Sequence, residues 1–183
     1  MAESLTSTVE CIVSWNFANA RDNSTVKDAS KLRHYKSFTA GSGDSQLQQM
    51  WHDRRYVTTA SGTDDIDLAG ALTNVFGTSI TFTAIKTLMI ENLGVPTAGL
   101  EGGTYTPTSG EDLIVGAAGA GEWNNLFDGL SSGKIHVKSG GVFVISAPLD
   151  GIAVAAGTND ILRVSHDGTQ DIVYKIVVTG ITG

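Results

Sequence analysis

The feature that most constrains the fold of this chain is a series of short apolar segments near its C-terminus, separated by turn residues. Rich in β-branched residues, they are KIHVKSG (134–140), GVFVISAP (141–148), GIAVAAG (151–157), DILRVSHDG (160–168) and QDIVYKIVVTGIT (170–182). Strands that follow one another about every eight to twelve residues are typical of sandwiches and barrels. No long helical segments alternate with them, which excludes a doubly wound α/β fold. We therefore expect a mainly β fold, an antiparallel β-sandwich of jelly-roll type with one short helix.

The N-terminal part of the chain also favours strands. Residues 5–17 alternate between apolar and polar side chains, which predicts a half-buried strand. Its length suggests an edge strand that pairs with something else, or a strand shared by two sheets. The polar, turn-rich residues 19–31 are predicted to be a loop or hairpin tip before a second alternating segment, 32–40. The chain length fits a single domain over 1–183, in which residues 1–50 are either part of the sandwich or an N-terminal arm.

One segment carries a helical pattern. The apolar residues at i, i+4, i+7 and i+8 are Leu68, Leu72, Val75 and Phe76. Gly77 follows where a glycine would close a helix, so the spacing predicts a helix of about two turns over 68–76. The next segment, 78–94, is rich in β-branched residues. After Ile85 its alternation slips, for which a β-bulge is one cause, or both faces of the strand become buried.

No set of catalytic residues emerges from the sequence. Ser146 lacks the G-x-S-x-G turn that exposes a nucleophile. His166 is followed by Asp167 and Gly168, a dipeptide that strongly indicates a hairpin turn. The glycine-rich segment 116–121 lacks the G-x-G-x-x-G spacing of a nucleotide-binding loop. The sequence therefore predicts no catalytic residue, no cofactor and no enzyme activity.

Metal binding is not indicated either. Asp64, Asp65 and Asp67 lack the spacing and the final Glu of a calcium loop, so we expect no metal site, although weak calcium binding at a subunit contact stays open. The first two aspartates have a simpler explanation, because a carboxylate near the start of the predicted helix favours the helix dipole. Cys11 is the single cysteine, which excludes an internal disulfide and a multi-cysteine zinc site.

The bulk properties exclude several classes of partner. The formal net charge of −7 argues against binding to nucleic acid or to an anionic membrane, since both need clustered Lys and Arg. The longest dense apolar run, VFVISAP, is far shorter than the ~20 residues that span a bilayer. The first ten residues contain no signal-peptide pattern. We therefore expect a soluble protein that is made in the cytoplasm.

Several stretches from Trp51 onward together cover most of residues 51–183. They are WHDRRYV, DDIDLAGALTNVFGTSITFTAIKTLMIEN, IVGAAG, LFDG, IHVKSGGVFVISAP, GIAVAAGTNDILRV and YKIVVTGITG. This part of the chain resembles a family of uncharacterised virion structural proteins of tailed bacteriophages. The most specific elements are D-L-x-G-x-L-x-x-x-F-G, followed by G-G-x-F-x-x-x-A-P and a final strand that ends in Gly. Residues 5–50 match less clearly.

The resemblance implies a structural virion protein encoded among head and tail genes, and it carries over no catalytic residue. We expect a capsid decoration, or cement, protein located on the head surface. It would form homotrimers and stabilise the head by bridging subunits of the major capsid protein, through apolar and hydrogen-bonding surface shared across capsomers. One alternative is a tail tube, adaptor or fibre-base component. Another is a receptor- or glycan-binding module that uses Trp51 or Trp123.

Three regions are expected to contact partners: the N-terminal strand within 1–17, the segment 41–56 and the loop 95–110. The strand could add to a neighbour's sheet. Arg54 and Arg55 could meet an acidic capsid surface. The candidate interface residues are Trp15, Phe17, Trp51, Arg54, Arg55, Tyr105 and Trp123.

Overall fold

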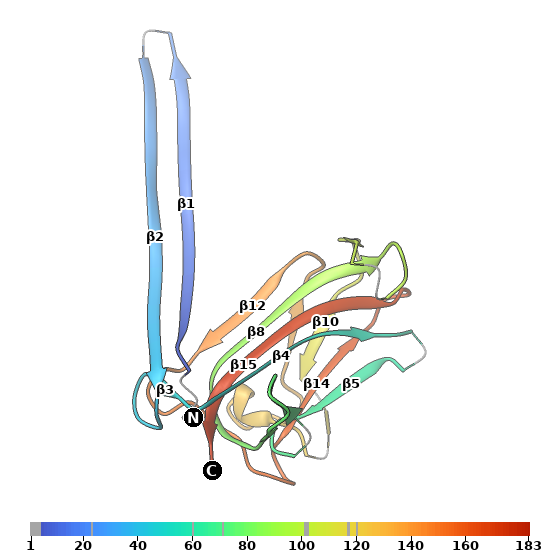
Figure 1. Cartoon of the computed structure of the whole chain (residues 1–183). Coiled ribbons are helices and arrows are strands. Elements are labelled where there is room, and N and C mark those ends of the chain that lie inside the picture. The colour runs from blue at the N-terminus through green and yellow to red at the C-terminus, as the bar shows by residue number, and fades with distance from the viewer. Residues whose placement is uncertain are drawn as a thin grey trace.

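The structure, a computed structural model, has two parts that differ in shape. A body of curved antiparallel sheets carries a long, straight β-hairpin that projects from one end (Figure 1). The residues described are 5–22, 24–59, 61–70, 72–100, 103–116, 118–119 and 121–183. The prediction of a mainly β, antiparallel sandwich is confirmed. The jelly-roll connectivity remains a prediction.

The body is built from two sheets that enclose one core. In the larger sheet the strand order is β12–β8–β15–β4, and β9 and β13 also pair with β8. Its strands are β4 (Gln49–Val57), β8 (Phe82–Pro96), β9 (Tyr105–Thr106), β12 (Val142–Ser146), β13 (Ile152–Ala153) and β15 (Ile172–Thr182). In the smaller sheet the order is β11–β10–β14–β5. Its strands are β5 (Thr63–Asp67), β10 (Leu113–Gly116), β11 (Lys134–Val137) and β14 (Ile161–His166).

Alternate residues of the paired strands form the core. The buried side chains of four central strands are Leu88 and Ile90, Tyr174 and Ile176, Leu113 and Val115, and Leu162 and Val164. Because successive residues of a strand point to opposite faces, each strand gives one set of side chains to the space between the sheets. Burying a side chain of this size stabilises the fold by about 1.5–3 kcal/mol. The body is therefore stabilised by the apolar side chains that the alternating pattern places between the two sheets.

The C-terminal half follows the sequence prediction closely. Each of the five predicted segments contains a strand, from β11 to β15. The predicted bulge in 78–94 is also present, since Thr179 faces Thr87 but Gly180 faces Ile85, which leaves one extra residue on β8. At this point a Cβ on Gly180 would lie 2.2 Å from the carbonyl oxygen of Ala84, so only glycine fits.

The predicted helix over 68–76 is wrong. Residues 72–73 and 79–80 form the short strands β6 (Leu72–Thr73) and β7 (Ser79–Ile80), joined by a tight turn. The Asn74 side chain accepts hydrogen bonds from the backbone N–H groups of Phe76 and Thr78, at 3.0 and 2.9 Å. Such bonds offer the backbone an alternative to a helix, which at two turns is marginal in any case. The described helical structure is a single 3₁₀ turn, η1 (Asn124–Phe127).

The projecting hairpin consists of β1 (Ser7–Arg21) and β2 (Ser24–Ala40). They pair without interruption along all 15 residues of β1, a length of about 50 Å at the usual rise per residue. The strand predicted for 5–17 exists, but its side chains from Glu10 onward are exposed rather than half-buried. Of the loop or hairpin tip predicted for 19–31, the hairpin tip is confirmed, since β1 ends at Arg21 and β2 begins at Ser24. A loop over the whole segment is wrong, because most of these residues continue the two strands. Their side chains pack on no second layer, so no burial imposes an alternating pattern on them.

The base of the hairpin is fixed to the body. β3 (Gln46–Leu47) runs parallel to the end of β2, and Phe38 and Leu47 are fully buried there. Backbone hydrogen bonds close the connection, from Thr39 to Ser45 and from Ser45 to Pro148, at 3.1 and 2.7 Å. We call residues 7–40 the arm and residues 46–183 the body.

Candidate assembly interface

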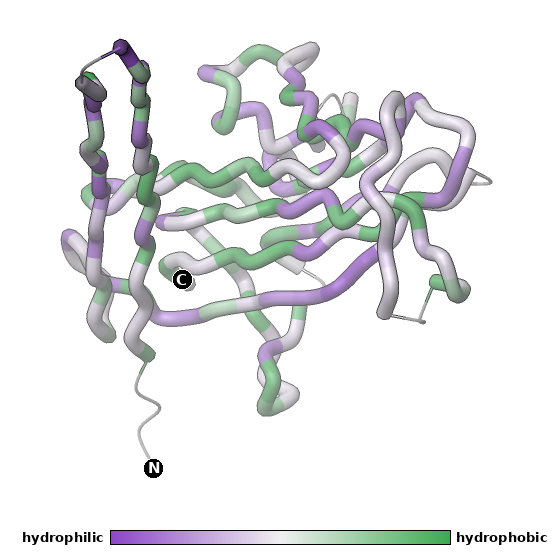
Figure 2. Tube along the Cα trace, turned by 90° about the horizontal axis from the view of Figure 1, so that it is seen from above, coloured by the Kyte–Doolittle hydropathy of each residue, from purple (hydrophilic) through white to green (hydrophobic). Residues whose placement is uncertain are grey.

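The two faces of the arm differ in chemistry. In an antiparallel pair, residues directly opposite each other place their side chains on the same face. The pairs on one face, here called the apolar face, are Val9–Lys36, Cys11–His34, Val13–Leu32, Trp15–Ser30, Phe17–Asp28 and Asn19–Val26. The pairs on the other, here called the charged face, are Glu10–Tyr35, Ile12–Arg33, Ser14–Lys31, Asn16–Ala29 and Ala18–Lys27. Figure 2 shows the resulting alternation of hydropathy along both strands.

The apolar face is open to solvent. The exposed fractions of its large side chains are 58% for Val13, 43% for Trp15, 70% for Phe17, 58% for Val26 and 69% for Leu32. Contiguous apolar surface of several hundred Å² on a soluble protein marks an interaction site. A lone two-stranded hairpin is also only marginally stable in water. The arm therefore has the form of an element that another surface covers.

The charged face of the arm carries an ion pair and a cation–π contact. Arg33 forms an ion pair with Glu10 at 2.5 Å, and its guanidinium lies 5.2 Å from the centre of the Tyr35 ring. Both partners of the ion pair are exposed, so the pair contributes little to stability. We expect this face to remain in water when the apolar face is covered.

The arm and the rest of the chain carry opposite charge. Residues 5–40 contain five Lys or Arg and three Asp or Glu, a formal charge of +2. The whole chain carries −7, so the remainder carries −9. This asymmetry favours contact between an arm and an acidic surface.

A second apolar feature lies near the base of the arm. Val75 and Phe76, at the tip of the β6–β7 turn, are 69% and 75% exposed. The turn is held by Asn74, which is buried and also donates a hydrogen bond from Nδ2 to Gln49 Oε1 at 3.2 Å. With Leu5 these residues line a shallow hollow. The helical interpretation of 68–76 hid this feature, because it placed both side chains in the core.

The seven predicted interface residues are not brought together. Trp15 and Phe17 lie on the apolar face of the arm, where they are exposed. Trp51 and Trp123 are core residues, 8% and 1% exposed, and the indole Nε1 of Trp123 donates to the carbonyl oxygen of Ala153 at 2.7 Å. Neither of these two rings is open to a partner or to a sugar.

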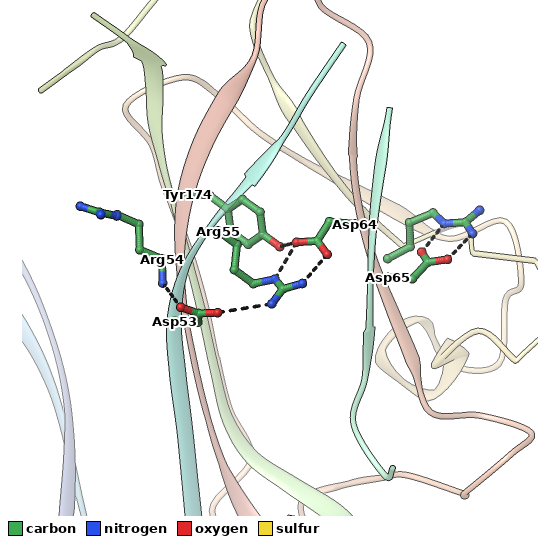
Figure 3. Close-up of polar contacts among 7 residues, drawn as sticks. Asp53, Arg54, Arg55, Asp64, Asp65 and Tyr174 are labelled. Carbon is green, nitrogen blue, oxygen red and sulfur yellow. Dashed lines mark hydrogen bonds and ion pairs between the residues drawn. The ribbon is translucent and has the colours of Figure 1, made fainter. Parts of the chain in front are cut away.

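Arg55 belongs to a half-buried hydrogen-bond network that joins three strands. Its Nε and Nη2 each donate to a carboxylate oxygen of Asp64 at 2.6 Å, and the Tyr174 hydroxyl donates to Asp64 at 2.6 Å (Figure 3). The Arg55 guanidinium also lies 5.8 Å from the centre of the Trp51 ring. Because Asp64 is on β5 and the other residues are on β4 and β15, the network ties the two sheets together.

The pKa values of both titratable donors in this network, Arg55 and Tyr174, are raised. Hydrogen bonds to the Asp64 carboxylate raise the pKa of Arg55. Burial is the main cause that raises the pKa of Tyr174, and the nearby Asp64 charge adds to it. Each donor therefore keeps its proton in the folded protein.

The remaining two predicted residues lie at separate places. Arg54 is exposed on the outer side of β4, and its side chain points away from Arg55 (Figure 3). Tyr105 is on β9, which pairs with the end of β8. Its ring is half-buried, and its hydroxyl is buried without a hydrogen bond to the described residues. Of the predicted set, only Trp15 and Phe17 share one surface.

The polar residues considered for chemistry are dispersed. Asp64 pairs with Arg55, Asp65 with Arg163 at 2.6 Å, and Asp67 accepts the backbone N–H of Ala69 at 2.9 Å. Ser146 ends β12 and His166 ends β14, which belong to different sheets. The described residues contain no group of three His, Cys, Asp or Glu placed to hold a metal. They also include no helix long and apolar enough to cross a membrane.

The chain was compared with protein-family models and with curated proteins, and neither comparison found a match. The interpretation of the surface therefore rests on its geometry. That geometry combines an exposed apolar arm, a rigid apolar turn beside its base and a body of opposite charge.

Proposed function

We propose that this protein is a structural subunit of a tailed-phage virion, a capsid decoration protein that is joined to its neighbours by its arm. The observation that carries the proposal is the exposed apolar face of the arm. Its large side chains are Val13, Trp15 and Phe17 on β1 and Val26 and Leu32 on β2. Such a face has no purpose in an isolated chain, and it lowers solubility. It is useful in an assembly, where each copy contributes one such contact and many weak contacts act together.

We further propose that the body is a jelly roll. Its eight main strands, counted along the chain, are β4, β5, β8, β10, β11, β12, β14 and β15. In these numbers the larger sheet has the order 1-8-3-6 and the smaller sheet 2-7-4-5. This order supports the proposal, because two interleaved Greek keys wound across two sheets produce it, and jelly rolls recur in viral capsid proteins.

In the proposed assembly the subunit is a homotrimer on the outer surface of the head and has no enzymatic role. The apolar turn at Val75 and Phe76 lies beside the base of the arm, so it is the part of the body that we expect to contact the major capsid protein. The support for this contact is that both apolar side chains are largely exposed and are held on a hydrogen-bonded turn. The fixed connection between arm and body would hold both contacts in a constant relative position.

The test is a binding assay with expanded, empty heads of the encoding phage that lack this protein. A short-arm variant, in which Asn-Gly replaces residues 10–35, joins Val9 to Lys36 through a two-residue hairpin turn and keeps the anchored base. We expect the full chain to saturate the heads and the short-arm variant to lose binding. Unchanged binding of the short-arm variant would rule out the arm as the joining element.

The alternative is a tail component, and the length of the arm favours it as a second candidate. At about 50 Å, the arm could reach a subunit in the next ring of a tail. Electron microscopy of the purified protein separates the two roles. Trimers that bind heads support decoration, whereas tubes or rings of six exclude it.

A further inference from the structure

We infer that the apolar face of the arm docks on the body of a second copy of this chain, against the outward face of the larger sheet. The inference names the arm's partner, and it rests on the proposal that the arm is an assembly element. It is carried by the fixed direction of the arm, by its charge and by an apolar row on the receiving face.

The arm cannot cover its apolar face with its own body. It leaves the body at its buried base and extends straight away from it (Figure 1). The connection from Ala40 to Gln46 is short and closed by backbone hydrogen bonds, including Gly41 to Leu47 at 3.1 Å. Folding back would require breaking these bonds and exposing Phe38. The covering surface must therefore come from another molecule.

Charge favours a body over a second arm as that surface. The arm carries +2 and the remainder of the chain −9, so net charge draws an arm toward another body and drives two arms apart. The receiving face itself carries Arg54, Lys175 and Glu91, so this attraction comes from the body as a whole and not from that face. The effect is screened beyond about 10 Å at ordinary salt concentration, so it steers the encounter more than it fixes the final affinity.

The outward face of the larger sheet offers an apolar row that matches the arm. Val144 on β12 lies opposite Met89 on β8, which in turn lies opposite Val177 on β15. Val144 is 44% exposed, and the other two are half-buried. Val142, two residues before Val144 and on the same face of β12, is 57% exposed. Trp15 and Phe17 are the aromatic side chains that we expect to lie across this row, since aromatic residues dominate interface energetics.

In this contact each copy gives an arm through one surface and receives an arm on another. Such a head-to-tail contact produces a ring if the rotation between copies closes, and an open chain if it does not. A ring of three copies would account for the expected homotrimer.

A pair of adjacent residues on the arm provides the first test. Val13 and Ile12 are 58% and 52% exposed, and they lie on the apolar and the charged face. In sedimentation equilibrium of the full chain, we expect Val13→Ser to weaken self-association about tenfold and Ile12→Ser to leave it nearly unchanged. Equal effects of the two changes would contradict docking through the apolar face.

A second pair tests the receiving surface. Val144→Ser should weaken self-association by a similar factor, and Leu130→Ser, which changes a 64% exposed residue elsewhere on the body, should not. Circular dichroism spectra and melting curves check that all four variants keep the fold. If Val144→Ser leaves association intact, the outward face of the larger sheet is not the docking site.

Cys11 allows a direct identification of the contact. It is the single cysteine, it is exposed, and it lies on the apolar face. A benzophenone maleimide on Cys11 of ¹⁵N-labelled full-length chain, mixed with unlabelled chain, should crosslink to β12, β8 or β15 of the unlabelled copy. Crosslinks to the unlabelled copy's arm would overturn the inference, as would crosslinks confined to the labelled copy.

The inference and the proposed function fail in different ways. If the purified chain stays monomeric at about 100 µM, a concentration far above the dissociation constants of specific interfaces, the inference is overturned. Loss of head binding by the short-arm variant would then still support the decoration role. Conversely, arm-to-body association without any binding to heads would support the inference and contradict decoration.

Discussion

The arm and the body are both antiparallel β-structure with alternating side chains, yet their apolar side chains are exposed in the arm and buried in the body. In the body, the apolar residues of each strand meet those of a facing sheet and are buried, as with Ile90 and Val164. In the arm, the same alternation produces an apolar face that is exposed, with no described residue of the chain covering it. Alternation therefore tells which residues share a face of a strand. It does not tell whether that face is covered within the same molecule.

The largest contrast is expected between two tryptophans. Trp123 fills the core and Trp15 is 43% exposed. We expect Trp123→Ala to lower the free energy of unfolding by about 3–5 kcal/mol, since it leaves a large cavity in the core. Trp15→Ala should lower it by less than about 0.5 kcal/mol in the monomer. Urea unfolding at low protein concentration measures both, and comparable losses would remove the distinction between arm and body.

A smaller contrast separates ion pairs of the body. Asp64→Asn weakens the contacts that join β4, β5 and β15, and we expect a loss of about 2 kcal/mol, because the Arg55 charge is only partly buried. Asp65→Asn, the control, breaks the more exposed pair with Arg163 and should cost less than about 1 kcal/mol. The same unfolding assay decides. A larger loss for Asp65→Asn would mean that the Arg55 network does not join the sheets.

The next expected effect is a pH dependence of stability, and it comes from Tyr174 in the core of the body. The pKa of Tyr174 is raised above its ordinary value of 10.0, chiefly by burial. Above pH 10 the unfolded chain releases this proton while the folded protein keeps it, so stability falls as pH rises. We expect the urea concentration at the unfolding midpoint to decrease between about pH 9 and pH 11, the range around the ordinary pKa of tyrosine. Tyr174→Phe should flatten this decrease, and it should cost about 1 kcal/mol at neutral pH through the lost hydrogen bond.

The smallest expected effect is that of shortening the arm. In the short-arm variant the body keeps its core and the buried anchors Phe38 and Leu47. Its free energy of unfolding should therefore change by less than about 0.5 kcal/mol. A substantial loss of stability would show that the arm supports the body, and the two would no longer be independent.

The sequence predicted the body well and the arm only in part. The segments from 134 to 182 have turn residues at their ends and β-branched residues between them, and each contains a strand. The polar composition of residues 24–31 favours a loop or hairpin tip. They form a strand because β1 holds them in register, although no second layer lies over them.

Two residues of the candidate interface, Trp15 and Phe17, could be predicted from the sequence, whereas Val75 and Phe76 could not. Trp15 and Phe17 are two residues apart in an alternating segment, so the sequence places their side chains on one face of the strand. Val75 and Phe76 were missed, since helical spacing also occurs when two apolar residues lie in the core and two on a turn. The burial of Trp51 and Trp123 depends on which strands face each other, and this cannot be read from local pattern.

The pairing of the arm has a consequence for the life of the subunit before assembly. The outer edges of β1 and of most of β2 have no strand partner among the described residues, so they present open backbone N–H and C=O groups. Edges of this kind promote aggregation, and lysines such as Lys27, Lys31 and Lys36 on β2 oppose it. In a newly synthesised subunit, correct docking of the arm therefore competes with aggregation through these open edges. Its yield should depend on how soon a partner covers the arm.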